Sequence, residues 1–263
     1  MALESSRAAR APHQLPPGRH GLARRFVARN QRERIHAAVA QVASTRAYVA
    51  MSVQDVVHEA GVSRRTFYEQ FKNKDHAFLA AYDEASGRLL TTVRAAMEAD
   101  KTFEAKISTG LRAFLELLAA SPAFAKMCIV EVLAAGPDAI ARRARTMEDF
   151  TGIFEDASRE TLVRENPPSP LVAETIVGGV YGTVYRRIAR GDTDELAALL
   201  PDLAESALLP YVGEARADAQ RKLLLGVKDR RRDHKAGFLG RSLQFRGRLG
   251  MRHARHLPVS RSS

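Results

Sequence analysis

The sequence predicts an all-α protein. Apolar residues recur at spacings of three and four along most of the chain, as they do on one face of a helix, for example at Ile35, Val39 and Val42. Prolines and glycines interrupt this pattern at intervals typical of helix ends, and no segment alternates apolar and polar residues as a strand does. We therefore expect packed helices without a sheet.

Charge divides the 263-residue chain into three parts. Residues 1–75 carry a net charge of +7, residues 76–220 carry −7 and residues 221–263 carry +11. A basic first part joined to an acidic middle suggests a module for a polyanion attached to a body with a different task. The composition excludes a collagenous, low-complexity or wholly disordered chain.

Cysteine usage and apolar run length favour a cytoplasmic protein. Cys128 is the single cysteine of the sequence and cannot form an internal disulfide, and no signal-peptide pattern follows Met1. No stretch without Asp, Glu, Lys and Arg exceeds 11 residues. Because a membrane-spanning helix needs about 20 apolar residues, we expect no membrane-spanning segment.

The first elements are an arm and two helices. Residues 1–21 are rich in proline and arginine and lack apolar periodicity, which predicts a flexible basic arm. The pattern becomes helical from residue 22. Ser52 begins the second helix, because it precedes the carboxylate of Asp55 by three residues, as in a capping box. Gly61 is expected to end this helix in the left-handed conformation.

The third helix begins at Ser63. Val62 and Phe67 stand at the positions of a hydrophobic staple around this N-cap. Phe67 and Phe71 are one turn apart and are predicted to face the core, which leaves Arg65 on the outside. Two short helices separated by a turn of about three residues have the spacing of a helix-turn-helix unit.

The remainder of the chain, up to residue 220, predicts one helix after another. Breaks are expected at Asp100, at Ser121-Pro122 and at Gly136-Pro137. A helix from about 138 to 165 is followed by helices at 171–189 and 195–212. The segment 221–263 combines 13 basic residues with five glycines, which predicts a disordered tail.

The run SVQDVVHEAGVSRRTFYEQFKNKD, from Ser52 to Asp75, resembles the DNA-binding domain of TetR-family transcriptional regulators. The motif spans about residues 25–82, and the later helices resemble the family's second domain in layout. The resemblance implies a three-helix DNA-binding domain with a helix-turn-helix at residues 22–75 and a helical ligand-binding and dimerisation domain at 76–220.

The resemblance also implies a function. A homodimer paired through helices 171–189 and 195–212 is expected to bind a palindromic double-stranded DNA operator as a repressor, and an unknown small-molecule effector is expected to release it. The family often has glycine where this chain has Ala47 and threonine where it has Met51. Ala47 is therefore expected to strain a turn that favours positive φ.

Base reading requires side chains that reach the major groove, where arginine binds O6 and N7 of guanine. Arg64 and Arg65 are the first candidates. Among positions carried over from the family, Gln54 matches one that reaches a base, and others match phosphate contacts. The candidate DNA-contacting residues are Ser52, Gln54, Ser63, Arg64, Arg65, Thr66, Tyr68 and Lys74.

A ligand pocket is expected among the middle helices. Its candidate lining residues are Phe114, Phe124, Cys128, Phe150 and Phe154. His58-Glu59 lacks the second histidine of a zinc-protease motif, and no nucleophile and base or paired carboxylates stand out. We therefore expect no enzyme, no cofactor and no metal site, and we expect Cys128 to be a core residue.

A second interpretation remains open. Residues 1–21 and 221–263 are basic enough to support a nonspecific, nucleoid-type nucleic-acid-binding protein, in which the helix-turn-helix supplies generic affinity. A sequence-specific regulator requires two half-sites at a fixed spacing, whereas a nonspecific binder does not. Sequence preference therefore distinguishes the two interpretations.

Overall fold

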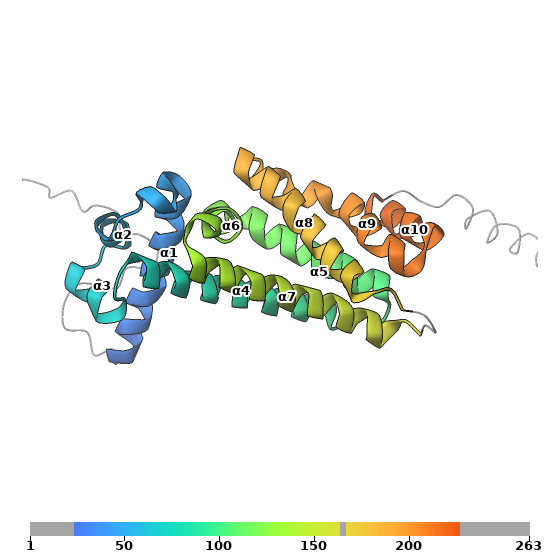
Figure 1. Cartoon of the computed structure of the whole chain (residues 1–263), viewed down its shortest axis with the longest axis horizontal. Helices are drawn as coiled ribbons and strands as arrows, with labels where there is room; N and C mark the ends of the chain where they lie inside the picture. Colours follow the sequence, from blue (N-terminus) through green and yellow to red (C-terminus); the bar gives the residue numbers. More distant parts are fainter. Residues whose placement is uncertain (1–23, 164–166, 227–263) are drawn as a thin grey trace, which may run out of the picture. The chain divides into compact units, whose positions relative to one another are not determined.

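The computed structural model describes residues 24–163 and 167–226. These residues form α-helices and two short 3-10 helices without a strand, which confirms the all-α fold class (Figure 1). The described residues up to Arg221 belong to one compact unit. The predicted arm at 1–21 lies outside the described residues, as does the predicted tail beyond residue 226.

The N-terminal domain is built on one long helix. Helix α1 (Arg24–Ala50) packs against the short helices α2 (Val53–Ala60) and α3 (Arg64–Gln70), and helix α4 (Lys74–Met97) continues from this domain into the body (Figure 1). The buried apolar side chains of α2 contact α1, as the periodicity predicts. Because α4 is continuous, one rigid element joins the two domains.

Local capping sets the ends of α2 and α3. The Ser52 hydroxyl accepts from the Asp55 N–H, and the Asp55 carboxylate accepts from the Ser52 N–H, so the predicted capping box is present. Gly61 has φ 58° and ψ 40°, the left-handed conformation expected at this helix end. The Ser63 hydroxyl accepts from the Thr66 N–H at 3.0 Å and begins α3.

Helix α1 is interrupted at Ala47. This residue has φ 64° and ψ 152°, a conformation that glycine adopts readily and alanine does not. The strain expected at Ala47 is therefore present. Because the break removes the Tyr48 N–H from the regular helical pattern, that group requires an acceptor outside the helix.

Five further α-helices form most of the body: α5 (Phe103–Ala120), α6 (Pro122–Ile129), α7 (Pro137–Thr161), α8 (Pro170–Arg190) and α9 (Leu200–Val212). The helix ends predicted at Ser121-Pro122 and Gly136-Pro137 are confirmed. A core cluster around Phe103, Phe154 and Tyr211 joins α5, α7 and α9, with ring centroids 5.1–5.4 Å apart. Within the described ranges, no single helix has the length and apolarity of a membrane span.

Several boundaries differ from the prediction. Residues Thr193–Leu199 form a 3-10 helix, and α9 starts at Leu200 instead of 195, because Pro201 has no N–H to continue a helical ladder from the preceding turn. A second 3-10 helix covers Glu131–Ala134. Helix α7 ends at Thr161. An unpredicted helix, α10 (Glu214–Leu224), extends past the boundary placed after residue 220.

Candidate DNA-binding surface and ligand cavity

Helix α3 presents two arginines to solvent. The side chains of Phe67 and Phe71 are at most 1% exposed, and they anchor the inner face of the helix. Arg64 and Arg65 lie on its exposed side. The Arg65 side chain is 88% exposed and pairs with Glu69 at 3.0 Å. An exposed pair of this kind stabilises a helix by less than about 0.5 kcal/mol, so Arg65 remains available for another partner.

The turn between α2 and α3 is held by α1. The Arg34 guanidinium donates to the Gly61 carbonyl at 2.8 Å and also to the Ala60 carbonyl. These contacts tie the end of α2 to the long helix behind it. Thr66 and Ser63 pair their hydroxyls at 2.9 Å at the first turn of α3. Arg34 therefore holds the chain before α3, and the hydroxyl pair holds the first turn of α3.

The flanking candidates are exposed to different degrees. Gln54 is exposed on the first turn of α2. The Ser52 hydroxyl and N–H both donate to Asp55, and these hydrogen bonds lower the pKa of the Asp55 carboxyl. Tyr68 is 51% exposed, and its ring packs edge-on against Phe67 at 5.4 Å. Its hydroxyl-bearing ring is therefore accessible beside the two arginines.

Lys74 has a structural task. Its ammonium group donates to the carbonyls of Tyr48 at 3.3 Å and Met51 at 3.1 Å, and it lies 4.7 Å from the Tyr48 ring centroid. The Tyr48 hydroxyl donates to Asp75. Lys74 therefore caps the end of α1, where a cation is favourable because the carbonyls of the last turn lack helical partners.

Two hydrogen bonds connect the end of α1 to the body. The buried carboxylate of Glu131 accepts from the Tyr48 N–H at 2.7 Å, and this supplies the acceptor that the break at Ala47 requires. The Lys126 ammonium donates to the Ser44 carbonyl at 2.6 Å. Both partners lie on α6 or directly after it, so α6 and the end of α1 form one hydrogen-bonded joint.

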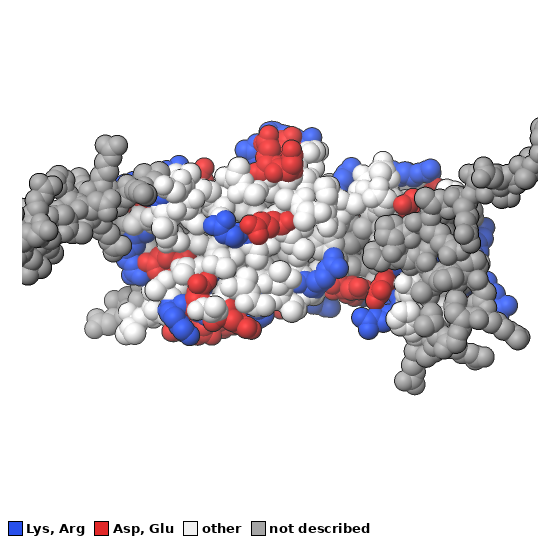
Figure 2. Space-filling view, turned by 180° about the vertical axis from the view of Figure 1, so that it is seen from behind, with Lys and Arg blue, Asp and Glu red and all other residues white. Residues whose placement is uncertain are grey.

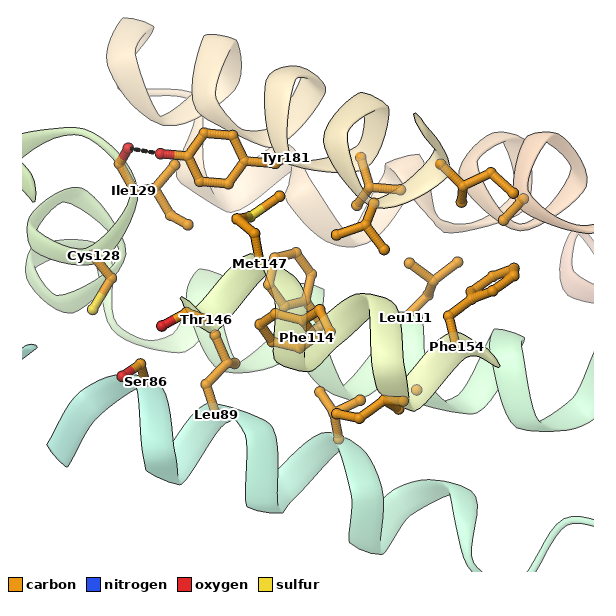
Figure 3. A pocket seen from close by; sticks show the side chains of 18 of the residues that line it. Ser86, Leu89, Leu111, Phe114, Cys128, Ile129, Thr146, Met147, Phe154 and Tyr181 are labelled. Carbon is orange, nitrogen blue, oxygen red and sulfur yellow. Dashed lines mark hydrogen bonds between the residues drawn. The ribbon is translucent and has the colours of Figure 1, made fainter. Parts of the chain in front are cut away.

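A cavity of about 110 Å³ lies inside the body. It is lined by residues of α4 to α8 and by one residue of α9, and most of its lining is apolar (Figure 3). A water molecule requires roughly 10–15 Å³ of such space, so the cavity has room for a small organic molecule. At its edge the Tyr181 hydroxyl donates to the Ile129 carbonyl at 2.6 Å, which connects α8 to the end of α6.

Known proteins share this arrangement. The sequence profile described as "Bacterial regulatory proteins, tetR family" matches residues 35–81, which include the whole helix-turn-helix. A TetR family transcription regulator from Marinobacter aquaeolei VT8 has a similar fold, with a TM-score of 0.55, 15% identity and coverage of 69% of this chain and 97% of that chain. The helix-turn-helix of this chain therefore matches the TetR family in sequence, and its described helices share the fold of TetR-family regulators.

Two further solved structures share the TetR-family fold. The fatty acid degradation regulator FadR from Bacillus halodurans matches with a TM-score of 0.61 and 19% identity, over 69% of this chain and 98% of that chain. The transcriptional regulator FadR from Bacillus subtilis, solved in complex with stearoyl-CoA, matches with a TM-score of 0.59 and 20% identity over the same shares.

The cavity of this chain includes four of the five predicted lining residues. Phe114, Cys128, Phe150 and Phe154 line it. Phe124 lies elsewhere: it is buried next to Arg88, whose guanidinium carbon is 5.4 Å from the ring centroid. Burial raises the pKa of the Cys128 thiol to about 12, so the thiol stays protonated near neutral pH, as expected for a core residue.

The sequence interpretation missed a charged residue in the lining. Arg143 contributes to the cavity wall together with Tyr82, Thr146 and Tyr181. Burial raises the pKa of Tyr82 to about 12, and burial also raises the pKa of Tyr181. The sequence did contain a signal, since Arg143 lies three residues before Thr146 and seven before Phe150, on the same face of α7.

The surface of the described residues offers no competing metal site. No group of three or more His, Cys, Asp or Glu side chains in that part of the chain is placed to hold an ion.

On the face shown in Figure 2, Lys and Arg side chains alternate with Asp and Glu and are separated by uncharged surface. The described surface visible in this view therefore has no continuous patch of one sign.

Proposed function

We propose that this TetR-family protein is a homodimeric, cytoplasmic repressor that leaves a palindromic operator when a small molecule occupies the body cavity. The observation that carries the proposal is the presence of two features in one compact unit: exposed Arg64 and Arg65 on α3, and an apolar cavity in the helical body. We place the DNA-binding domain at residues 22–75 and the ligand-binding body at 76–220.

We assign DNA contact to residues of α2 and α3 with their N-caps and to the start of α4. Arg64 and Arg65 are positioned to read bases because their inner neighbours anchor α3 rigidly. Gln54 and Tyr68 extend the exposed surface on either side. Ser52, Ser63 and Thr66 also lie at this surface. The Ser52 and Ser63 hydroxyls cap α2 and α3, and we assign the three residues to contacts with the DNA backbone. Lys74 keeps its assignment as a phosphate contact, and it also fixes the end of α1.

Dimerisation is assigned to α8 and α9. Gly178 and Gly179 are exposed on α8, with open space where a Cβ would stand in the described part of the protomer. Leu171 on α8 is 64% exposed and Leu209 on α9 is 47% exposed. Exposed leucines and exposed small residues on these two helices suit close packing of helices from a second copy.

Ligand control rests on the connection between the cavity and α1. A ligand shifts the dimer toward a DNA-incompetent arrangement by as much as its affinities for the two arrangements differ. The similar FadR of Bacillus subtilis is in complex with a small molecule, stearoyl-CoA, which supports ligand responsiveness in this fold. The hydrogen bonds from Tyr181 to Ile129 and from Tyr48 to Glu131 provide a contact path for this response.

The experiment is selection of binding sites from random duplex DNA at near-physiological salt. The full chain is compared with a chain that stops after Gly226, because α10 reaches Leu224 and should be kept intact. Enrichment of a palindrome by both proteins is the expected result. Binding without sequence preference, which fades as the salt concentration rises, contradicts the proposal and favours the nonspecific nucleic-acid-binding interpretation.

A further inference from the structure

The charge inside the cavity wall forms no ion pair with a carboxylate among the described residues. Among the described residues that line the cavity, Arg143 is the one with a formal charge. Its Nε atom is buried and has no hydrogen-bond acceptor among the described residues. Its guanidinium carbon lies 4.1 Å from the ring centroid of Tyr181. A half-buried guanidinium without a carboxylate partner is costly, so the site favours an anion that supplies one.

Polar groups gather at one end of the cavity. Tyr82 and Ser86 come before Leu89 and Val93 on α4, and on α7 Arg143 and Thr146 come before the aromatic residues. Figure 3 shows Ser86, Cys128 and Thr146 at one end, with Leu111 and Phe154 at the other. The cavity is therefore amphipathic, with its cation at the polar end and an apolar remainder.

The hydroxyl groups at the polar end already donate within the protein. The Tyr82 hydroxyl lies 3.2 Å from the Thr146 hydroxyl, which donates to the Arg142 carbonyl at 3.1 Å. The Tyr181 hydroxyl donates to the Ile129 carbonyl at 2.6 Å. Because these protons are engaged, the Arg143 guanidinium, which contacts Tyr181 but whose Nε has no described acceptor, is the donor that remains for a ligand.

We propose that the effector is an apolar molecule with one carboxylate, which Arg143 binds while the apolar part lies along Leu111, Phe114 and Phe154. This inference rests on the proposed function and names its ligand class. A carboxylate matches the planar guanidinium with two parallel hydrogen bonds and one compensating charge. A cationic ligand is repelled by the same group, and a neutral one leaves its charge uncompensated.

The test compares carboxylates with alcohols of the same skeleton. Binding of decanoate, decanol, phenylbutyrate and phenylbutanol to the full-length protein is measured by calorimetry. A charge-assisted hydrogen bond to a half-buried group predicts that each carboxylate binds about 10- to 100-fold more tightly than its alcohol. Arg143→Met is expected to remove this preference while keeping the affinity for the alcohol, which also shows that the cavity is intact.

Two variants sharpen the comparison. Arg145→Met removes an exposed arginine from the same helix and should leave the preference for carboxylates unchanged. Arg143→Lys keeps the charge but loses the planar pair of donors, so its preference should be intermediate. A wild-type protein that binds no carboxylate more tightly than its alcohol overturns the proposal, as does an Arg143→Met protein that keeps the preference.

Operator release is measured separately, by fluorescence anisotropy with the selected palindrome. If decanoate binds through Arg143 but leaves operator affinity unchanged, the ligand class stands and the release step of the proposed function fails. If a neutral molecule releases the operator equally from wild type and Arg143→Met, release stands and the carboxylate assignment is overturned. The two failures are therefore distinguishable.

Discussion

Ala47 carries the clearest strain in the described chain. Its φ of 64° with ψ of 152° lies in a region that costs a non-glycine residue about 1–3 kcal/mol. The side chain is exposed, so removing its Cβ loses no buried contact. Glycine gives back part of the gain, because it raises the entropy of the unfolded chain.

We expect Ala47→Gly to raise the free energy of unfolding by about 1 kcal/mol, measured by denaturant titration at fixed protein concentration. Ala37→Gly is the control, since Ala37 is exposed on the regular part of the same helix. This substitution should destabilise the protein by about 1 kcal/mol. A destabilised Ala47→Gly protein would show that the alanine conformation is not strained.

Arg65 is expected to determine one position of the operator. Arg65→Ala should weaken operator binding by about 10- to 100-fold, corresponding to the loss of a bidentate contact to guanine, and should relax preference at one base pair. Stability should stay within about 0.5 kcal/mol, because the residue is exposed. Anisotropy titrations against operators changed at single positions measure both effects. A uniform loss on all sequences would reduce Arg65 to a phosphate contact.

At the scale of elements, the contact between α1 and the segment after α6 depends on Glu131. Glu131→Ala leaves the Tyr48 N–H buried without an acceptor, so we expect a loss of about 1–3 kcal/mol in unfolding free energy. Backbone hydrogen exchange at Tyr48 should accelerate in the same variant. Glu148→Ala, which removes an exposed glutamate, is the control. Unchanged exchange at Tyr48 would contradict the role of this hydrogen bond.

Sequence reasoning predicted the elements whose ends are set locally. Ser52, Gly61 and Ser63 act on neighbours within four residues, so their roles could be predicted from spacing. The contacts that Lys74 and Phe124 make inside the protein could not be predicted, because they depend on α1 and α4, which lie far away in sequence. The cavity shows the same division. Most of its aromatic residues could be predicted, but which of them face one cavity depends on how the helices pack.

At the scale of the whole molecule, the glycines of α8 predict the assembly. Gly179→Leu adds a side chain where the described protomer has open space and improves helix propensity, so each protomer should remain folded. Close packing with a second copy should then be blocked, and sedimentation should show monomers. Gly87→Leu, at an exposed glycine of α4 with equally open space, should leave the dimer intact. A dimeric Gly179→Leu protein would place the interface elsewhere.

The hydrogen bond from Tyr48 to Glu131 also limits how the protein can be divided for engineering. An operator-reading head taken as residues 22–75 would carry the broken end of α1 but leave its buried acceptor, and the Lys126 ammonium, in the discarded body. A chimera that transplants this head onto another sensor therefore needs a glutamate and a lysine at matching places in the recipient. The DNA-binding domain and the ligand-binding body can be exchanged when these two hydrogen bonds are kept.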